Sequence, residues 1–112
     1  IQKGDEVWPE LVKAIKDSIL FLVIFSENYA SSSWCLNELI QLMECKKQGE
    51  DIHVIPVFYK IDPSQVRKHS GSYHVAFTKH EKDRKVSKEK MQKWKNALDE
   101  AANLSGFHSN AY

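Results

Sequence analysis

Hydrophobic and polar positions in the first part of the chain predict a helix followed by a strand. Leu11, Ala14 and Ile15 recur at helical spacing, so we expect residues 10–17 to form a short amphipathic helix. Residues 19–25 then form a continuous apolar run rich in β-branched and aromatic side chains. Such a short run is typical of a strand that is covered on both faces. We therefore predict that 19–25 is a central strand of a parallel sheet.

A second helix and a second strand follow in the same order. The helix is expected over 34–47, where one apolar stripe consists of Leu36, Leu39, Ile40 and Met43. Gly49 lies just beyond the basic end of this helix, where a terminating glycine is expected. Residues 53–59 are typical of a strand. Because Pro56 cannot donate a backbone hydrogen bond, it favours an edge strand or a bulge at this place.

The remaining sequence predicts further helices and a last short strand. Residue 61 begins a long irregular stretch, which we expect to contain a short helix over 73–81. Ser87 is the expected cap of a helix over 88–104, and 106–108 begin a short strand. The order helix, strand, helix, strand, helix predicts an α/β fold with a parallel sheet.

The expected sheet is short of one strand. A strand that is apolar on both faces belongs inside a sheet, with a hydrogen-bonded neighbour on each side. The chain offers one long partner for 19–25, which is the strand expected over 53–59. The pattern therefore predicts a single domain over 1–112 that lacks its beginning.

Composition and charge exclude several classes of protein. The 112 residues suit one domain, and 42% hydrophobic residues are enough for a core. A net charge of +1 argues against a domain that binds nucleic acid by neutralising phosphates. No apolar run approaches the ~20 residues that span a bilayer, so no membrane partner is expected. Cys35 and Cys45 have neither a disulfide framework nor zinc-type spacing, which favours a reducing compartment.

The start of the helix over 34–47 is where the sequence points to chemistry. In parallel α/β sheets, ligands bind in the crevice outside the carboxyl ends of the strands, and this helix must begin there. At about 100° per residue, Glu38 turns away from the packed stripe, and Trp34 lies one turn before it. A carboxylate beside an aromatic ring can stabilise a cationic transition state and pack a planar ring.

Less specific explanations stay open for the same residue types. An exposed glutamate early in a helix interacts well with the helix dipole, and on physical grounds this role is the commoner one. Cys35 is more often a small buried apolar residue than a nucleophile. His69, His74 and His80 do not share a helical face, so no metal site is expected.

Several short motifs, in a fixed order along the chain, resemble a known family. They lie at 4–11, 19–30, 33–39, 54–59, 62–67, 71–73 and 76–77. One of them, Ser33-Trp34-Cys35-Leu36-Asn37-Glu38-Leu39, contains the family's W-x-x-x-E pattern. Together they resemble the plant-type TIR domain, a signalling module shared by Toll-like receptors, interleukin receptors and plant disease-resistance proteins.

The resemblance implies a flavodoxin-like, three-layer α/β fold with a five-stranded parallel sheet between helices. Aligned in this way, 1–112 is a single, N-terminally incomplete TIR domain that lacks the first two strands and the first helix. The family's first strand-end loop, which supplies Arg, Gly and Asp near the ribose and phosphates, then has no counterpart here. The Ser-His pair that the family uses on its first helix for assembly also has none.

The resemblance further implies an activity in plant innate immunity. Family members are NAD+ glycohydrolases (NAD+ nucleosidases) that self-association switches on, with NAD+ as substrate and no cofactor. The catalytic glutamate of the family pattern corresponds to Glu38. Trp34 corresponds to the aromatic side chain on the nicotinamide side of the pocket, and Cys35 to the cysteine beside it.

Two other segments match family surfaces. The loop 3–9 matches the segment that gates the pocket and contacts a neighbouring subunit. It assigns substrate binding to Lys3, Gly4, Asp5 and Trp8, and self-association to Lys3, Asp5 and Glu6. Gly106 matches a second self-association surface. The expected partners are other TIR domains, without membrane or specific nucleic acid, and the expected location is the cytoplasm or the nucleus.

Two other classes of function remain as alternatives. A non-catalytic interaction module would nucleate signalling assemblies without turnover, and charge reversal at Lys3 or Asp5 would then abolish signalling but not nicotinamide release. A flavin-binding or response-regulator domain of the same fold would need an acidic pair at a strand end, which is not visible here. Unchanged nicotinamide release after Glu38→Gln would exclude the proposed chemistry.

Overall fold

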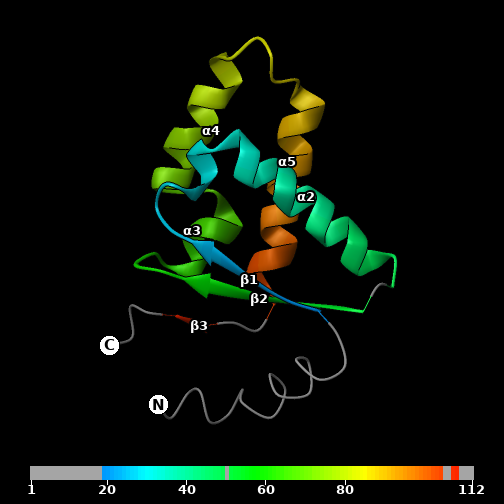
Figure 1. Cartoon of the computed structure of the whole chain (residues 1–112). Coiled ribbons are helices and arrows are strands. Elements are labelled where there is room, and N and C mark those ends of the chain that lie inside the picture. The colour runs from blue at the N-terminus through cyan, green and yellow to red at the C-terminus, as the bar shows by residue number, and fades with distance from the viewer. Residues whose placement is uncertain (1–18, 50, 105–106, 109–112) are drawn as a thin grey trace.

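The computed structural model describes residues 19–49, 51–104 and 107–108, which form a parallel sheet with helices packed against it (Figure 1). The elements in chain order are β1 (Ile19–Phe25), η1 (Tyr29–Ser31), α2 (Ser33–Lys47), β2 (Ile52–Phe58), α3 (Pro63–Lys68), α4 (Ser72–Lys82), α5 (Lys88–Ala102) and β3 (Phe107–His108). The predicted helix over 10–17 lies outside the described residues. The α/β class and the parallel sheet are confirmed.

The strand order among the described residues is β1-β2-β3, with both pairings parallel. β1 and β2 pair along their whole length, from Ile19 opposite Ile52 to Phe25 opposite Phe58. β3 contacts β2 on its other side, where Val57 and Phe58 are paired. β1 is therefore an edge strand of the described sheet rather than the central strand that its apolar run predicts. Its second expected neighbour is not among the described residues.

The expectation that Pro56 demotes its strand was wrong. β2 is the middle strand, and its register with β1 runs through Pro56 without a bulge. Alternate residues of a strand between two parallel neighbours bond to opposite sides. The Tyr59 N–H donates to the Phe25 carbonyl at 2.9 Å, so the nitrogen of Pro56 faces the β3 side. β3 begins to pair only at Val57, so the proline ring removes no bond from the β1–β2 ladder.

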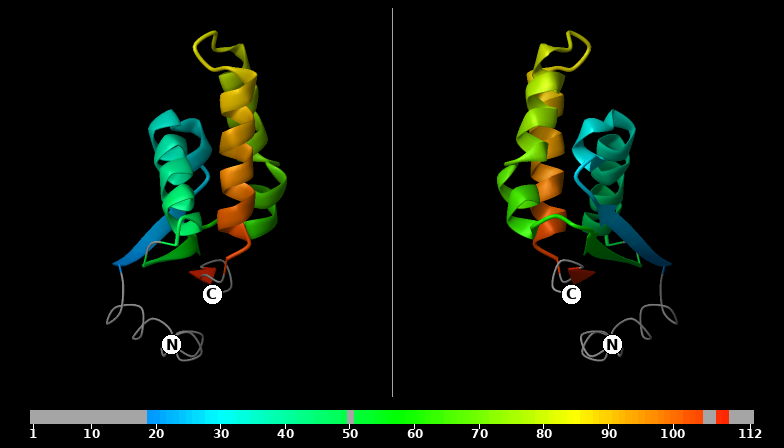
Figure 2. Two further views of the ribbon diagram at one scale, coloured as in Figure 1. Left: turned by 90° about the vertical axis from the view of Figure 1, so that its right-hand side faces the viewer. Right: turned by 90° about the vertical axis from the view of Figure 1, so that its left-hand side faces the viewer.

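The described helices cover one face of the sheet (Figure 2). Val23 and Phe25 of β1 point to that face and are buried. The intervening side chains lie on the opposite face, where Leu22 is 59% exposed and Ile24 is 56% exposed. The sequence predicts cover on both faces of this strand, and the described residues provide it on one.

The core lies between the sheet, α2 and α5, because each helix presents an apolar stripe. The predicted stripe of α2 is confirmed, with Leu36, Leu39 and Met43 buried and Ile40 packed against the core. Ser32 caps α2, since its hydroxyl accepts a hydrogen bond from the Cys35 N–H at 3.2 Å. Buried residues of α5 are Trp94, Ala97, Leu98, Ala101 and Ala102.

The stretch after residue 61, expected to be irregular, contains a helix before the predicted one. α3 begins after Asp62, whose carboxylate accepts from the Ser64 N–H at 2.8 Å, and Pro63 occupies the first turn. Val66 is its buried residue, and His69 ends the helix with a positive φ of 54°. A helix this short, with one side chain in the core, leaves no periodic pattern, whereas its cap is visible in the sequence.

Candidate functional site

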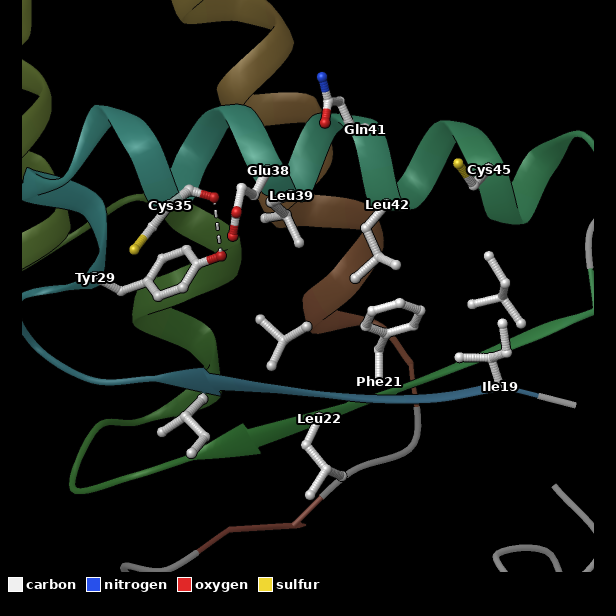
Figure 3. A pocket seen from close by; sticks show the side chains of 13 residues that line it. Ile19, Phe21, Leu22, Tyr29, Cys35, Glu38, Leu39, Gln41, Leu42 and Cys45 are labelled. Atoms are coloured by element: carbon white, nitrogen blue, oxygen red, sulfur yellow. Dashed lines mark hydrogen bonds between the residues drawn. The ribbon is translucent and has the colours of Figure 1, made fainter. Parts of the chain in front are cut away.

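An open cavity of about 550 Å³ lies along β1, mainly between this edge strand and α2, and it reaches past the strand to Leu22 on the other face (Figure 3). Most of its lining is apolar, and polar groups gather toward the carboxyl end of β1. It is lined by Ile19, Phe21, Leu22, Val23, Ile24, Tyr29, Cys35, Glu38, Leu39, Gln41, Leu42, Cys45 and Ile52. The cavity therefore follows the length of β1 rather than its tip alone, where the sequence places the crevice.

The helical wall of the cavity is a second stripe of α2. Cys35, Glu38, Leu42 and Cys45 recur at intervals of three and four and line the cavity. This stripe adjoins the core stripe, and Leu39 of the core stripe also lines the cavity. The spacing was available in the sequence, but mixed polarity hides it, because a stripe with Glu and Cys has no clear apolar period.

The polar end of the cavity combines a phenol, a thiol and a carboxylate. The Tyr29 hydroxyl donates a hydrogen bond to the Cys35 carbonyl at 3.2 Å. In Figure 3 the carboxyl group of Glu38 points toward this hydroxyl. The Phe25 ring contacts the Tyr29 ring edge-on, with 4.8 Å between the ring centroids. Tyr29 is therefore held between the end of β1 and the first turn of α2.

Burial raises the pKa of Tyr29 above its ordinary value, and electrostatic interaction with Cys35 and Glu38 raises it further. The phenol therefore keeps its proton at neutral pH and acts as a hydrogen-bond donor. The loop that carries Tyr29 follows β1, where the sequence places the crevice, but the sequence assigns no role to Tyr29 itself. Its position depends on the turn η1, which no hydrophobic pattern predicts.

The loop that carries Tyr29 is fixed to α4 by side-chain hydrogen bonds. The Tyr73 hydroxyl donates to the Ser26 carbonyl at 2.8 Å, although the two residues are 47 positions apart. Tyr73 is fully buried, and burial raises its pKa, with smaller contributions from Tyr29 and Cys35. The same carbonyl also accepts from the Tyr29 N–H at 3.3 Å, so Tyr73 joins α4 directly to the turn that carries Tyr29.

The residues expected at the site fall into three groups. Glu38 and Cys35 line the cavity. Trp34 lies one turn before Glu38 on α2, is 71% exposed and is not among the lining residues. The others, which are Lys3, Gly4, Asp5, Glu6, Trp8 and Gly106, lie outside the described residues.

The described part of the chain contains no group of three or more His, Cys, Asp or Glu side chains that could hold a metal ion. None of the described helices combines the length and the apolar character that crossing a bilayer requires.

Comparison with known sequences decides the family. A sequence profile described as the TIR domain matches residues 1–112. The chain belongs to the TIR domain family. This TIR domain shares 48% identity over 108 residues with the disease resistance protein RPV1 of Vitis rotundifolia, covering 96% of this chain and 7% of RPV1. It shares 49% identity over 106 residues with the TMV resistance protein N of Nicotiana glutinosa, covering 95% of this chain and 9% of that protein.

A solved structure supports the same family. The TIR domains of the activated Roq1 resistosome, which directly recognises the pathogen effector XopQ, align with a TM-score of 0.73 and 46% identity. The alignment covers 88% of this chain and 59% of that one. The predicted plant-type TIR family and its α/β fold are thus confirmed, while this TIR domain spans less than a tenth of the length of RPV1 and N.

Proposed function

We propose that this TIR domain hydrolyses NAD+ to nicotinamide and ADP-ribose-type products, with Glu38 as the catalytic residue. The observation that carries the proposal is the position of Glu38, in the cavity between β1 and α2 and beside the Tyr29 hydroxyl. The volume of about 550 Å³ falls within the ~300–1,000 Å³ of small-molecule pockets. Glu38 is exposed where it lines the cavity, and its carboxylate can stabilise a positive charge that develops beside it.

The proposed reaction needs one negative group near the ribose. The bond between C1′ of the ribose and the nicotinamide nitrogen breaks, and its electron pair leaves with nicotinamide. C1′ becomes oxocarbenium-like, and the Glu38 carboxylate stabilises this charge, as carboxylates do at other glycosidic bonds. Water adds its oxygen to C1′ and releases a proton. The products are nicotinamide, ADP-ribose and H+.

The neighbours of Glu38 have supporting roles in this proposal. Tyr29 keeps its proton, so it adds no second negative charge and can hydrogen-bond to a ribose hydroxyl. Trp34, on the adjacent surface of α2, offers an exposed indole on which the planar nicotinamide ring can stack. The apolar side chains along β1 line the rest of the cavity and offer it a surface for apolar parts of a ligand.

The similarity to resistance proteins supports a role in plant immune signalling. The proposed location is the cytoplasm or the nucleus. The Roq1 TIR domains belong to an activated resistosome, and this supports self-association of the present domain as the event that switches on catalysis. Lys3, Asp5, Glu6 and Gly106 are the proposed contacts between copies. NAD+ is the proposed substrate, and the proposed chemistry uses no cofactor.

The test is a pair of substitutions on one helix, made in the full-length protein. Glu38→Gln removes the charge in the cavity, and we expect nicotinamide release to fall roughly 100-fold or more. Glu44→Gln makes the same chemical change on an exposed position of α2 outside the cavity lining, and release should stay at the parent rate. Nicotinamide is quantified by chromatography at several NAD+ concentrations.

Two outcomes would contradict the proposal. Equal release by the parent and the Glu38→Gln protein would show that Glu38 is not catalytic. Signalling that Glu38→Gln leaves intact, but charge reversal at Lys3 or Asp5 abolishes, would favour the non-catalytic assembly module instead.

A further inference from the structure

The loop before α2 is fastened at a second point on α4. Ala30 in η1 is fully buried, and its carbonyl accepts a hydrogen bond from His80 Nε2 at 2.8 Å. Because a carbonyl can only accept, Nε2 of His80 must carry a proton. The contact joins residues 50 positions apart, and Ala30 directly follows Tyr29, whose side chain lines the cavity.

The same histidine packs against a residue that fixes α2. The rings of His80 and Trp94 lie with 4.9 Å between their centroids and 58° between their planes. Trp94 is 1% exposed, and its indole N–H donates to Asn37 Oδ1 at 2.9 Å. Asn37 directly precedes Glu38. We use the name His80 clamp for His80, Trp94 and Asn37.

The clamp therefore acts next to both polar groups of the cavity without lining it. Through Ala30 it holds the turn that presents Tyr29, and through Asn37 it fixes how α2 is rotated about its axis. None of its members is among the residues that line the cavity. A shift of about 1 Å at a reacting group is enough to slow catalysis markedly.

We propose that the His80 clamp is a positioning device that sets the distance between Tyr29 and Glu38, and that His80 is its key residue. The proposal rests on the proposed function, since it explains how the same site is held in its working geometry. His80 acts through the Ala30 carbonyl and is a positioning residue, not a catalytic one. The N–H of the His80 ring matters more than the volume of the ring, because the Ala30 carbonyl loses a hydrogen bond when this N–H is removed.

Three substitutions on α4 separate the hydrogen bond from general packing. His80→Leu removes the donor but fills space, and His80→Gln keeps an N–H at the reach of Nε2. His74→Leu is the matched control, because His74 is exposed on the same helix. Asn37→Leu tests the other arm of the clamp at an exposed position, where a failure to fold is not expected.

The full-length proteins are compared by steady-state nicotinamide release and by amide hydrogen exchange of residues 26–36, with β2 as internal reference. For His80→Leu we expect kcat to fall about tenfold with KM unchanged, because a positioning defect acts on the transition state. Exchange in 26–36 should become about tenfold faster while β2 is unaffected. His80→Gln should restore both values, His74→Leu should change neither, and Asn37→Leu should lower kcat.

Equal kcat values for His80→Leu and His80→Gln, or unchanged exchange in 26–36, would overturn the proposal. If His80→Leu does not fold, an unchanged kcat for Asn37→Leu would overturn it as well. Failure of the proposed function is distinguishable, because the parent protein would then release no nicotinamide. The exchange rates of the same variants would still show whether the clamp orders the loop.

Discussion

The two faces of β1 carry the same kinds of side chain but have opposite surroundings. Phe25 is fully buried against the helices, whereas its neighbour Ile24 is 56% exposed on the other face. Val23 and Leu22 repeat the contrast, with 9% and 59% exposed. In the second half of this strand, burial therefore depends on the face and not on residue type. Nearer its start, Phe21 shares the face of Val23 and Phe25 and is still 41% exposed.

The same contrast separates the contacts that hold the candidate site from the exposed face of β1 beside it. On the helix side, core packing and the contacts of Tyr73, His80 and Trp94 fix the loop and α2. On the other side, a row of large apolar groups meets solvent in the described structure. Adjacent exposed apolar side chains mark a surface that another element or molecule covers. The site is thus built on a strand whose stability comes from one face.

The largest expected effect comes from alanine substitutions at two consecutive positions of β1. Phe25→Ala empties a site in the core, in contact with Tyr29 and Phe58, and should lower the free energy of unfolding by ~3–5 kcal/mol. Ile24→Ala removes atoms that already contact solvent, and should change it by about 0.5 kcal/mol or less. Urea unfolding of the 112-residue chain measures both values.

A loss of more than about 2 kcal/mol in the free energy of unfolding for Ile24→Ala would mean that this face of β1 is covered, contrary to the described structure. A free-energy cost at Ile24 as large as that at Phe25 would show that another part of the protein lies on this face.

Features set by local chemistry were predictable from the sequence. The bounds of β1 match the expected run, and the core stripe of α2 is the predicted one. The Ser87 hydroxyl accepts from the Lys90 N–H, so the predicted cap of α5 is confirmed, and Gly49 has the expected positive φ of 79°. Each of these features depends on residues close together in the sequence, so short-range spacing predicts it.

Features set by long-range contacts were not predictable. The place of Pro56 in the middle strand depends on which side its nitrogen faces, and the sequence does not state this. Tyr29 joins the site because Tyr73 and His80, from a helix much later in the chain, hold its loop. The sequence offers His80 only as a possible metal ligand, since a hydrogen bond to a distant carbonyl leaves no spacing signal.

A smaller loss of stability is expected at alkaline pH, where the ionisation of Tyr29 and Tyr73 affects the free energy of unfolding. The pKa values of Tyr29 and Tyr73 are raised by burial, so both stay protonated in the folded chain while the unfolded chain ionises near pH 10. Above that pH the unfolded state binds fewer protons, and stability falls with rising pH. The limiting slope is about 1.4 kcal/mol per pH unit for each tyrosine.

Urea unfolding between pH 7 and pH 11 measures this slope. Replacement of both tyrosines by phenylalanine should lower stability at pH 7, because two hydrogen bonds are lost, and should flatten the curve above pH 10. A double variant as steep as the parent would show that other groups cause the alkaline loss.

The smallest effect on stability is expected from the surface contact between α2 and α5. These helices are joined by the Trp94–Asn37 hydrogen bond and by an ion pair between Lys47 Nζ and Glu100 Oε1 at 2.7 Å. The two charged side chains are 64% and 37% exposed, so water and salt weaken their attraction. Lys47→Met, Glu100→Gln and the double variant should give a coupling energy of about 0.5 kcal/mol or less, which decreases further in high salt. A coupling above ~1 kcal/mol that persists in salt would mean that this surface pair, and not the indole hydrogen bond, sets the position of α2 against α5.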